Sequence, residues 1–249
     1  MMNSPGRHMR VALFATCIND IMFPDTPTAV ADLLTRLGCM VDYSPVQTCC
    51  GQMFTNTGYF NAGLKTVRTY IDAFEDYDYI VAPSASCVGS VRHQHQMLAQ
   101  NKPRLRKQVD RLVARTYDLS EFLVDVLKVT DVGATFRHKV TYHPTCHSLR
   151  VARVGDRPLQ LLRAVKGLDL IELPEALTCC GFGGTFSVKN PDVSAAMAGQ
   201  KADNVVKTGA EFVVTGDNAC LMNIGGILHR RSAPVKPIHL ASILVSQEA

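Results

Sequence analysis

Eight of the nine cysteines in this 249-residue chain fall into two sets of four with the same internal order. Each set has an adjacent Cys-Cys-Gly phrase with one lone cysteine upstream and one downstream. Four neighbouring thiols are unfavourable as free thiolates because like charges repel, and a bound cation or cluster removes that repulsion. The pattern therefore indicates metal binding or thiol redox chemistry at Cys17, Cys49, Cys50 and Cys87, and again at Cys146, Cys179, Cys180 and Cys220.

Sites with four sulfur ligands are typical of zinc or of iron–sulfur clusters. The paired Cys-x-x-Cys of a zinc ribbon is missing, because Ser90 and Asn223 stand three residues after Cys87 and Cys220. An adjacent pair can place both sulfurs on one polynuclear centre if the backbone turns, which Gly51 and Gly181 permit. The glycines that follow the second pair, at 181, 183 and 184, are expected to offer N–H groups to the sulfurs. Two alternatives remain open, namely buried unliganded thiols and a transient disulfide between the neighbouring cysteines.

Each cysteine site lies just beyond the end of a segment that is predicted to be a strand. The strands are therefore the elements that position the cysteines. Helical segments separate the strands, so we expect parallel sheets with right-handed crossovers. The carboxyl ends of parallel strands share one edge, where ligands bind. Three strands in each half therefore deliver one, two and one thiols to the same edge. The predicted strands are 11–15, 39–43 and 79–82 in the first half, and 139–142, 168–173 and 211–215 in the second.

The two halves read as a duplication. The offset between corresponding cysteines is 129 residues for Cys17 and Cys146, 130 for Cys49 and Cys179, and 133 for Cys87 and Cys220. Such a steady offset predicts two Rossmann-like α/β halves with parallel sheets, 10–130 and 131–249, related by pseudo-two-fold symmetry. The ninth cysteine, Cys39, falls opposite Leu168 in this alignment and is expected to be a small apolar core residue.

Composition narrows the class of protein. The chain is 47% hydrophobic and 19% charged, which supports a large buried core, and its net charge of +4 is mild. The chain has no long basic run of the kind that binds nucleic acid, and its apolar runs are too short for a transmembrane segment. Residues 1–9 are polar and lack the apolar core expected of a signal peptide. We expect a cytoplasmic protein, and in a reducing compartment clustered thiols serve as metal ligands or redox centres more often than as disulfides.

The second half has more polar and ionisable residues beside its first cysteine than the first half has. His143, His147 and Arg150 surround Cys146, whereas Phe14 and Ile18 stand at the places that match the two histidines. We treat these three residues as catalytic candidates, with each histidine a possible metal ligand, hydrogen-bond donor to a ligand, or proton relay. The alternatives are ordinary loop histidines and a surface arginine. His93 and His95 fall on a polar helix face and are assigned no role. We expect the redox-active site in the second half.

The spacing of the motifs resembles the cysteine-rich CCG-domain family, which includes the B subunit of heterodisulfide reductase and the iron–sulfur subunit of glycolate oxidase. The chain is most similar to the lactate-utilisation protein A family, and the likeness covers nearly all of it. The phrases that carry the resemblance are GlnThrCysCysGlyGln at 47–52, ThrTyrHisProThrCysHisSerLeuArg at 141–150, CysCysGlyPheGlyGlyThrPheSerValLys at 179–189 and AspAsnAlaCysLeuMetAsn at 217–223.

The resemblance implies an iron–sulfur electron-transfer subunit that works with a ferredoxin-type iron–sulfur subunit and a third subunit to oxidise L-lactate to pyruvate. The fuller family pattern ends in Cys-x-x-Cys, and both halves lack the last cysteine, at Ser90 and Asn223. The cluster type is therefore open, with a 4Fe-4S cluster expected and zinc an alternative in one half. Two other functions stay in view, a thiol–disulfide reductase of the heterodisulfide type and a zinc-stabilised assembly subunit.

Overall fold

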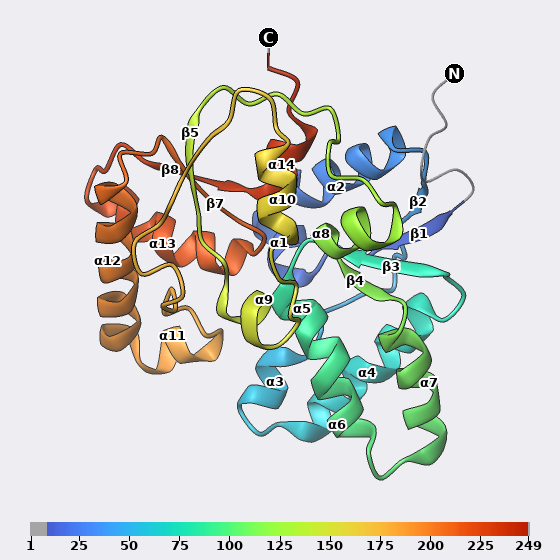
Figure 1. The fold of residues 1–249 in the computed structure, drawn as a ribbon. Coiled ribbons are helices and arrows are strands. Elements are labelled where there is room, and N and C mark those ends of the chain that lie inside the picture. Colours follow the sequence, from blue (N-terminus) through green and yellow to red (C-terminus); the bar gives the residue numbers. More distant parts are fainter. Residues whose placement is uncertain (1–8, 249) are drawn as a thin grey trace. The chain divides into compact units, whose positions relative to one another are not determined.

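The computed structural model describes residues 9–248. The chain divides into two compact units between Val129 and Thr130. Unit 1 below means residues 9–129 and unit 2 means residues 130–248, and Figure 1 shows both with their elements labelled. Within residues 9–248 no helix is both long and apolar enough to cross a membrane.

Unit 1 is built on a parallel four-stranded sheet in the order β2-β1-β3-β4. Its central strands are short continuous apolar runs because both faces of the sheet are covered. The strands are β1 (Arg10–Leu13), β2 (Met40–Asp42), β3 (Tyr79–Ala82) and β4 (Thr116–Asp118). The α-helices are α1 (Cys17–Met22), α2 (Asp25–Arg36), α3 (Gln52–Asn56), α4 (Phe60–Phe74), α5 (Ala85–Gly89), α6 (Gln96–Ala99), α7 (Pro103–Val113) and α8 (Leu119–Glu121), and two π-helical segments are η1 (Ser90–His95) and η2 (Phe122–Val126).

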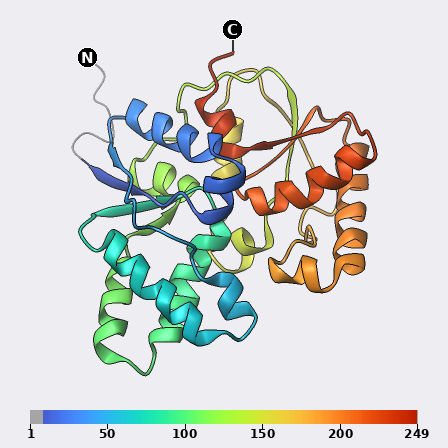
Figure 2. The same ribbon diagram turned by 180° about the vertical axis from the view of Figure 1, so that it is seen from behind.

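Two layers of helix cover this sheet. One face of β1 and β3 packs against α4, η1 and α7 in a single apolar cluster that includes the second cysteine of the pair, Cys50. Phe14, Tyr70 and Phe74 pack edge to face within it. Helix α2 contacts β1 and β2 and buries Val30 and Leu33, and Figure 2 shows it lying along the sheet. The strand ends that lead to the cysteines are thereby fixed from both sides.

Unit 2 repeats this plan with a parallel sheet in the order β6-β5-β7-β8. Helices α12 and α13 lie side by side and enclose a core that contains Cys180, Cys220 and Ile224. Both units therefore have the α/β fold and the strand order of a duplicated chain, as the sequence predicts. The strands are β5 (Lys139–Tyr142), β6 (Asp169–Ile171), β7 (Phe212–Thr215) and β8 (Lys236–His239), and the helices are α9 (Cys146–Arg150), α10 (Arg157–Arg163), α11 (Thr185–Lys189), α12 (Pro191–Lys207), α13 (Asn218–Arg230) and α14 (Leu240–Val245).

Each sheet has a fourth strand that the sequence reading missed. Strand β4 begins three residues after the end of α7, and β8 ends at His239, directly before the last helix at Leu240–Val245. Both are short edge strands whose sequences, Thr-Tyr-Asp and Lys-Pro-Ile-His, contain no continuous apolar run. Pro237 in β8 is tolerated because an edge strand has backbone groups without a ladder partner.

The two prolines of segment 20–27 predict a loop from the sequence, and this prediction is wrong. The segment contains the end of α1 and the start of α2. Pro24 stands at the N-cap of α2 and Pro27 lies in its first turn. The first turn of a helix has N–H groups without intrahelical partners, so a proline there removes nothing that the helix needs.

Candidate metal centres

The four cysteines of the first set lie together at the carboxyl edge of the sheet in unit 1. Cys17 opens α1 just after β1, the Cys49-Cys50 pair lies between β2 and α3, and Cys87 lies in α5 just after β3. Their thiols form a continuous hydrogen-bonded chain in the order Cys17, Cys49, Cys50 and Cys87. Cys50 is buried and the other three are half-buried, so one side of the group is open to solvent.

The second set has the same arrangement in unit 2. Cys146 opens α9 after β5, the Cys179-Cys180 pair precedes α11, and Cys220 lies in the first turn of α13 after β7. The chain of contacts runs from Cys146 through Cys179 and Cys180 to Cys220, where the two Sγ atoms are 3.0 Å apart. All eight cysteines of the two sets are free thiols.

The first cysteine of each adjacent pair is the acidic thiol of its set. Hydrogen bonds from Cys17 and Cys50, together with the Gly51 N–H, lower the pKa of Cys49 to about 3. Bonds from Cys146 and Cys180, with the Gly181 N–H, lower the pKa of Cys179 to about 2. The donating thiols Cys17, Cys50, Cys146 and Cys180 have raised pKa values because they give protons to these bonds and are desolvated by burial. The first cysteine of each pair is thus a thiolate, and the thiols bonded to it become metal ligands by losing protons.

Glycine is required after each cysteine pair, as the sequence indicates. Gly51 and Gly181 both have a φ of +83°, a conformation that L side chains rarely adopt. The N–H of each glycine donates to the Sγ atom two residues earlier at 3.3 Å. A Cβ at Gly181 would lie 2.7 Å from the carbonyl oxygen of Ser194. This turn therefore folds both thiols of a pair toward the same centre and presses the loop against α12.

Ser90 and Asn223 stand where the longer family motif has its last cysteine, and their side chains donate hydrogen bonds to the cysteine loops. In unit 2 the Nδ2 of Asn223 donates to the carbonyl of Cys180 at 2.8 Å. In unit 1 the carbonyl of Cys50 accepts from the Oγ of Ser90 at 3.4 Å and from the Nε2 of His95 at 2.8 Å. Ser90 and His95 reach one carbonyl because η1 has π-helical turns, in which residues five apart lie close together.

His95 corrects the sequence analysis, which assigned it no role on a polar helix face. Its side chain is buried, and burial lowers its pKa to about 4. His93 is exposed, as expected. The helical spacing of His95 could have predicted its burial, because His95 continues the apolar stripe formed by Val88, Val91 and Ala99.

Two further residues that hold the cysteine loops were missed. Gln47 bridges the end of β1 and the first cysteine loop, since its Oε1 accepts from Ala15 N at 2.9 Å and its Nε2 donates to Leu13 O at 3.1 Å. In unit 2 the fully buried Lys201 donates from Nζ to the carbonyl of Glu175 at 2.6 Å. Burial lowers the pKa of Lys201, while the nearby thiols of Cys180 and Cys179 oppose that shift. The position of this lysine on the apolar stripe of α12 could have predicted from the sequence that its side chain is buried.

The three catalytic candidates lie around the second set. His143 is fully buried at the end of β5. Burial and the Lys201 ammonium lower its pKa to about 4, against the smaller effects of Cys179 and the Ala176 carbonyl. His147 places Nδ1 3.6 Å from the Sγ of Cys146. Arg150 is exposed and donates to the carbonyl of Leu177 at 3.3 Å, so it braces the second cysteine loop from outside.

Among the described histidines, cysteines and acids, one group has metal-site geometry. His143, Cys180 and Cys220 place a ring nitrogen and two sulfurs within 4.8 Å of one another, and all three are buried. Cys39 belongs to neither set. It is buried immediately before β2, and burial raises its pKa to about 11, which fits the core role expected for it.

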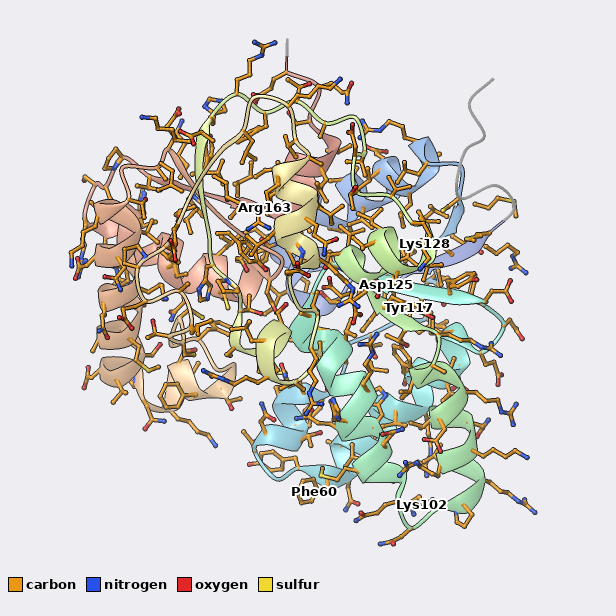
Figure 3. The ribbon with its side chains drawn as sticks, in the orientation of Figure 1. Phe60, Lys102, Tyr117, Asp125, Lys128 and Arg163 are labelled. Atoms are coloured by element: carbon orange, nitrogen blue, oxygen red, sulfur yellow. The ribbon has the colours of Figure 1, made fainter. Side chains whose placement is uncertain are left out.

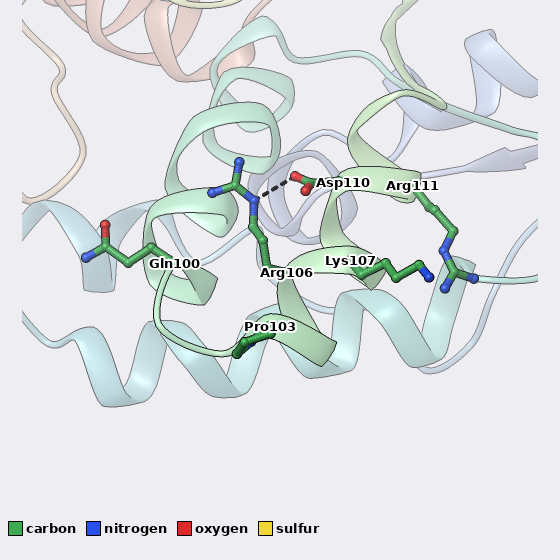
Figure 4. Close-up of a pocket in the computed structure, with 6 residues that line it drawn as sticks. All are labelled: Gln100, Pro103, Arg106, Lys107, Asp110 and Arg111. Atoms are coloured by element: carbon green, nitrogen blue, oxygen red, sulfur yellow. Dashed lines mark hydrogen bonds and ion pairs between the residues drawn. The ribbon is translucent and has the colours of Figure 1, made fainter.

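Two hollows lie away from the thiols themselves. A cavity of about 760 Å³ in unit 2 is lined by Tyr142, Pro144 and Ala176, beside His143 and the second cysteine loop, and by Arg163 of α10, which Figure 3 labels. A shallow basic hollow of about 620 Å³ lies on α7 in unit 1. Its residues are Gln100, Pro103, Arg106, Lys107, Asp110 and Arg111, and Figure 4 shows the 2.8 Å ion pair of Arg106 with Asp110.

Comparison with known proteins agrees with the duplicated architecture. The cysteine-rich domain family, CCG, matches this chain twice, over residues 11–92 and 140–225. A solved structure of a hypothetical protein from Helicobacter pylori superposes on the whole chain with a TM-score of 0.70 and 10% identity. This chain spans about half, 52%, of that protein, and the likeness shows a shared fold.

Curated relatives match over almost their full length. Proteins called lactate utilization protein A are 46% identical in Oceanobacillus iheyensis, covering 95% of this chain and 96% of the relative. They are 43% identical in Halalkalibacterium halodurans, covering 96% and 98%, and 43% identical in Geobacillus kaustophilus, covering 95% and 98%. The matched regions include all eight cysteines of the two sets. The chain therefore belongs to the lactate utilization protein A family of cysteine-rich CCG-domain proteins.

Proposed function

We propose that this protein is an iron–sulfur electron-transfer subunit of a complex that oxidises L-lactate to pyruvate. The observation that carries the proposal is the pair of four-thiol groups, each with the same chain of contacts and the same acidic first cysteine. Four thiols held this close are costly without a cation, because every further deprotonation adds a buried like charge. Two such groups in one chain favour a function that needs two centres.

The side chains present fit an iron–sulfur cluster in each unit. Cys17, Cys49, Cys50 and Cys87 would hold one, and Cys146, Cys179, Cys180 and Cys220 the other. A bound cluster supplies a centre that gains and loses single electrons. The chain's own contribution is to orient the thiols through the glycine turns, to donate N–H groups to the sulfurs, and to keep the buried side of each centre away from water.

The substrate and partners are proposed from the family. Relatives are named for lactate utilization, and oxidation of lactate to pyruvate releases two electrons and two protons. We propose that a ferredoxin-type iron–sulfur subunit and a third subunit share this work in the cytoplasm. In that arrangement this chain passes electrons singly, and its half-buried cysteines give the partner access to each centre.

The proposal is tested by metal and sulfide analysis of protein purified without oxygen. We expect iron and acid-labile sulfide in both units, and visible absorption that bleaches on reduction. Protein that binds neither iron nor sulfide after attempted reconstitution would contradict the proposal. Stoichiometric zinc without visible absorption would support the assembly role instead.

A second function is favoured by one observation, the low pKa of Cys179 beside a second thiol. A thiolate next to a thiol is the arrangement that reduces disulfides. If the chain is a thiol–disulfide reductase of the heterodisulfide type, Cys179→Ser and Cys180→Ser abolish turnover of a disulfide substrate. Unchanged turnover in both variants would rule this function out, and Cys39→Ser serves as the control for loss of a thiol outside the two sets.

A further inference from the structure

His143 is a buried polar side chain whose ring nitrogens are poorly satisfied. It is fully buried, and neither Nδ1 nor Nε2 makes a hydrogen bond of regular geometry, although the Ala176 carbonyl lies near enough to raise its pKa. Native proteins rarely leave a buried ring nitrogen in this state, and an exception calls for a reason such as an ion that the nitrogen binds. A neutral imidazole has one such lone pair, and it is the commonest metal-binding side chain in proteins.

The surroundings of His143 supply the rest of a metal site. Its ring nitrogen, the Sγ of Cys180 and the Sγ of Cys220 all lie within 4.8 Å of one another. The three residues come from the end of β5, the loop that carries the second cysteine pair and the first turn of α13. Three separate segments therefore bring donor atoms to one point inside unit 2.

Unit 1 provides an internal comparison. Phe14 stands three residues before Cys17, as His143 stands three residues before Cys146. Phe14 packs against the rings of Tyr70 and Phe74, at centroid distances of 5.3 and 5.4 Å, and offers no donor atom. The buried histidine of unit 1, His95, uses its Nε2 on the carbonyl of Cys50. A ring nitrogen with no hydrogen bond of regular geometry, aimed at the thiols, is thus a feature of the second set and not of the first.

A fifth donor cannot come from the position where the longer motif has its last cysteine. Asn223 occupies that position in unit 2, and its amide donates to the carbonyl of Cys180 at 2.8 Å and to the Oγ of Ser194 at 3.4 Å. Ser90 occupies it in unit 1 and bonds to Gln94 and to the carbonyl of Cys50. Both side chains serve to hold the loop of the cysteine pair.

We propose that His143 is a direct nitrogen ligand of the metal centre in unit 2, which makes that centre a mixed imidazole and thiolate site while the centre in unit 1 has sulfur ligands alone. This inference rests on the proposed iron–sulfur function. His143 is then a further donor beside the four cysteines of unit 2, and the different ligand sets give the two centres different reduction potentials.

The test uses the full chain, purified without oxygen and labelled with ¹⁵N in histidine. In the paramagnetic state we expect a strongly coupled histidine nitrogen in the electron–nuclear spectrum, and a nitrogen shell in iron X-ray absorption. The coupling should be lost in His143→Phe, which copies Phe14 of unit 1. It should be kept in His147→Ala, which removes the other histidine beside Cys146.

The outcomes separate the inference from the function beneath it. Wild-type protein with iron and sulfide but no strongly coupled histidine nitrogen would overturn the inference alone, as would a coupling that survives in His143→Phe. Protein that binds no iron and sulfide would overturn the proposed function and the inference with it. The wild-type spectrum decides the question without any variant, so poor folding of His143→Phe cannot hide the answer.

Discussion

At the scale of single residues, the two sets of four thiols have the same pattern of protonation, but different side chains hold their cysteine loops in place. In both units the first cysteine of the pair is held as a thiolate by two thiols and a glycine N–H. In unit 1 the cysteine loop is tied by the neutral side chains of Gln47 and His95. In unit 2 it is tied by the buried Lys201. The Lys201 ammonium therefore accompanies the second group, where it offsets the negative charge of bound thiolates.

Replacing Lys201 with methionine tests this support. The variant removes the bonds from the Lys201 ammonium to the carbonyls of Glu175 and Ala176, although Glu175 O keeps its bonds from Thr178, and a hydrogen bond from a charged donor contributes about 1.5–3 kcal/mol. We expect Lys201→Met to lower the free energy of unfolding of unit 2 by that amount and to weaken its metal binding. Lys207→Met, an exposed position on the same helix, is the matched control. Equal stability of the two variants in denaturant titrations would show that the Lys201 bonds contribute nothing.

At the scale of elements, each centre depends on a turn that must close against a neighbouring helix. Gly181 lies so near α12 that a Cβ would approach Ser194 O at 2.7 Å and Met197 Cβ at 2.8 Å. Within the turn, the N–H of Gly181 donates to the Sγ of Cys179 and fixes its local shape. The geometry of the thiols is thus set by the contact between a loop and a helix.

Gly181→Ala should destabilise unit 2 by more than the strain of a positive φ alone, because the new Cβ also clashes with α12. Strain and the clash with α12 together should cost about 3 kcal/mol or more in unit 2, and the variant should lose metal from its centre. Gly209→Ala is the control, since Gly209 also has a positive φ of +67° but nothing lies within 4 Å of a Cβ there. That control should cost only about 1 kcal/mol and keep its metal. Similar losses in both variants would mean that α12 does not confine the turn.

A second prediction at this scale concerns Asp118, at the N-cap of α8. Burial raises its pKa to about 7, although hydrogen bonds from Ser120 oppose the shift. Between about pH 4 and pH 7 the folded chain therefore holds a proton that the unfolded chain has released. Stability is greatest at the acidic end of this window and falls as the pH rises through 7.

Asp118→Asn removes that titration. The free energy of unfolding of the wild type, relative to Asp118→Asn, should fall by a few kcal/mol, on the order of 1.4 kcal/mol per unit of pKa shift, between pH 4 and 8. Asp72→Asn, an exposed change on α4, controls for the loss of one charge. A wild-type curve parallel to that of Asp118→Asn would contradict the raised pKa.

At the scale of the whole molecule, the chain holds one fold twice. Each unit has its own parallel sheet, its own apolar core and its own set of four thiols. Every hydrogen bond described above for one set is made within the same unit. Damage to one centre should therefore leave the other able to bind metal.

Single cysteine variants measure this independence. Cys50→Ala and Cys180→Ala should each lose about half of the iron, and the double variant should lose nearly all of it, because contributions from independent sites add. Cys39→Ala should keep all its iron, since Cys39 belongs to neither set. Complete iron loss in either single variant would instead mean that the two centres form only together.

The sequence by itself determined the grouping of the cysteines, the duplicated parallel-sheet fold and the need for Gly51 and Gly181. These follow from residue type, apolar runs and spacing, which are local properties of the chain. Only the tertiary structure decided how the groups are supported. His95 and Lys201 look polar in sequence, yet folding buries both beside a cysteine loop. His143 and the two cysteines that flank its ring are 37 or more residues apart along the chain. They meet because parallel strands bring segments that are far apart in the sequence to one edge of the sheet. The spacing of residues along the chain does not predict how close these side chains lie.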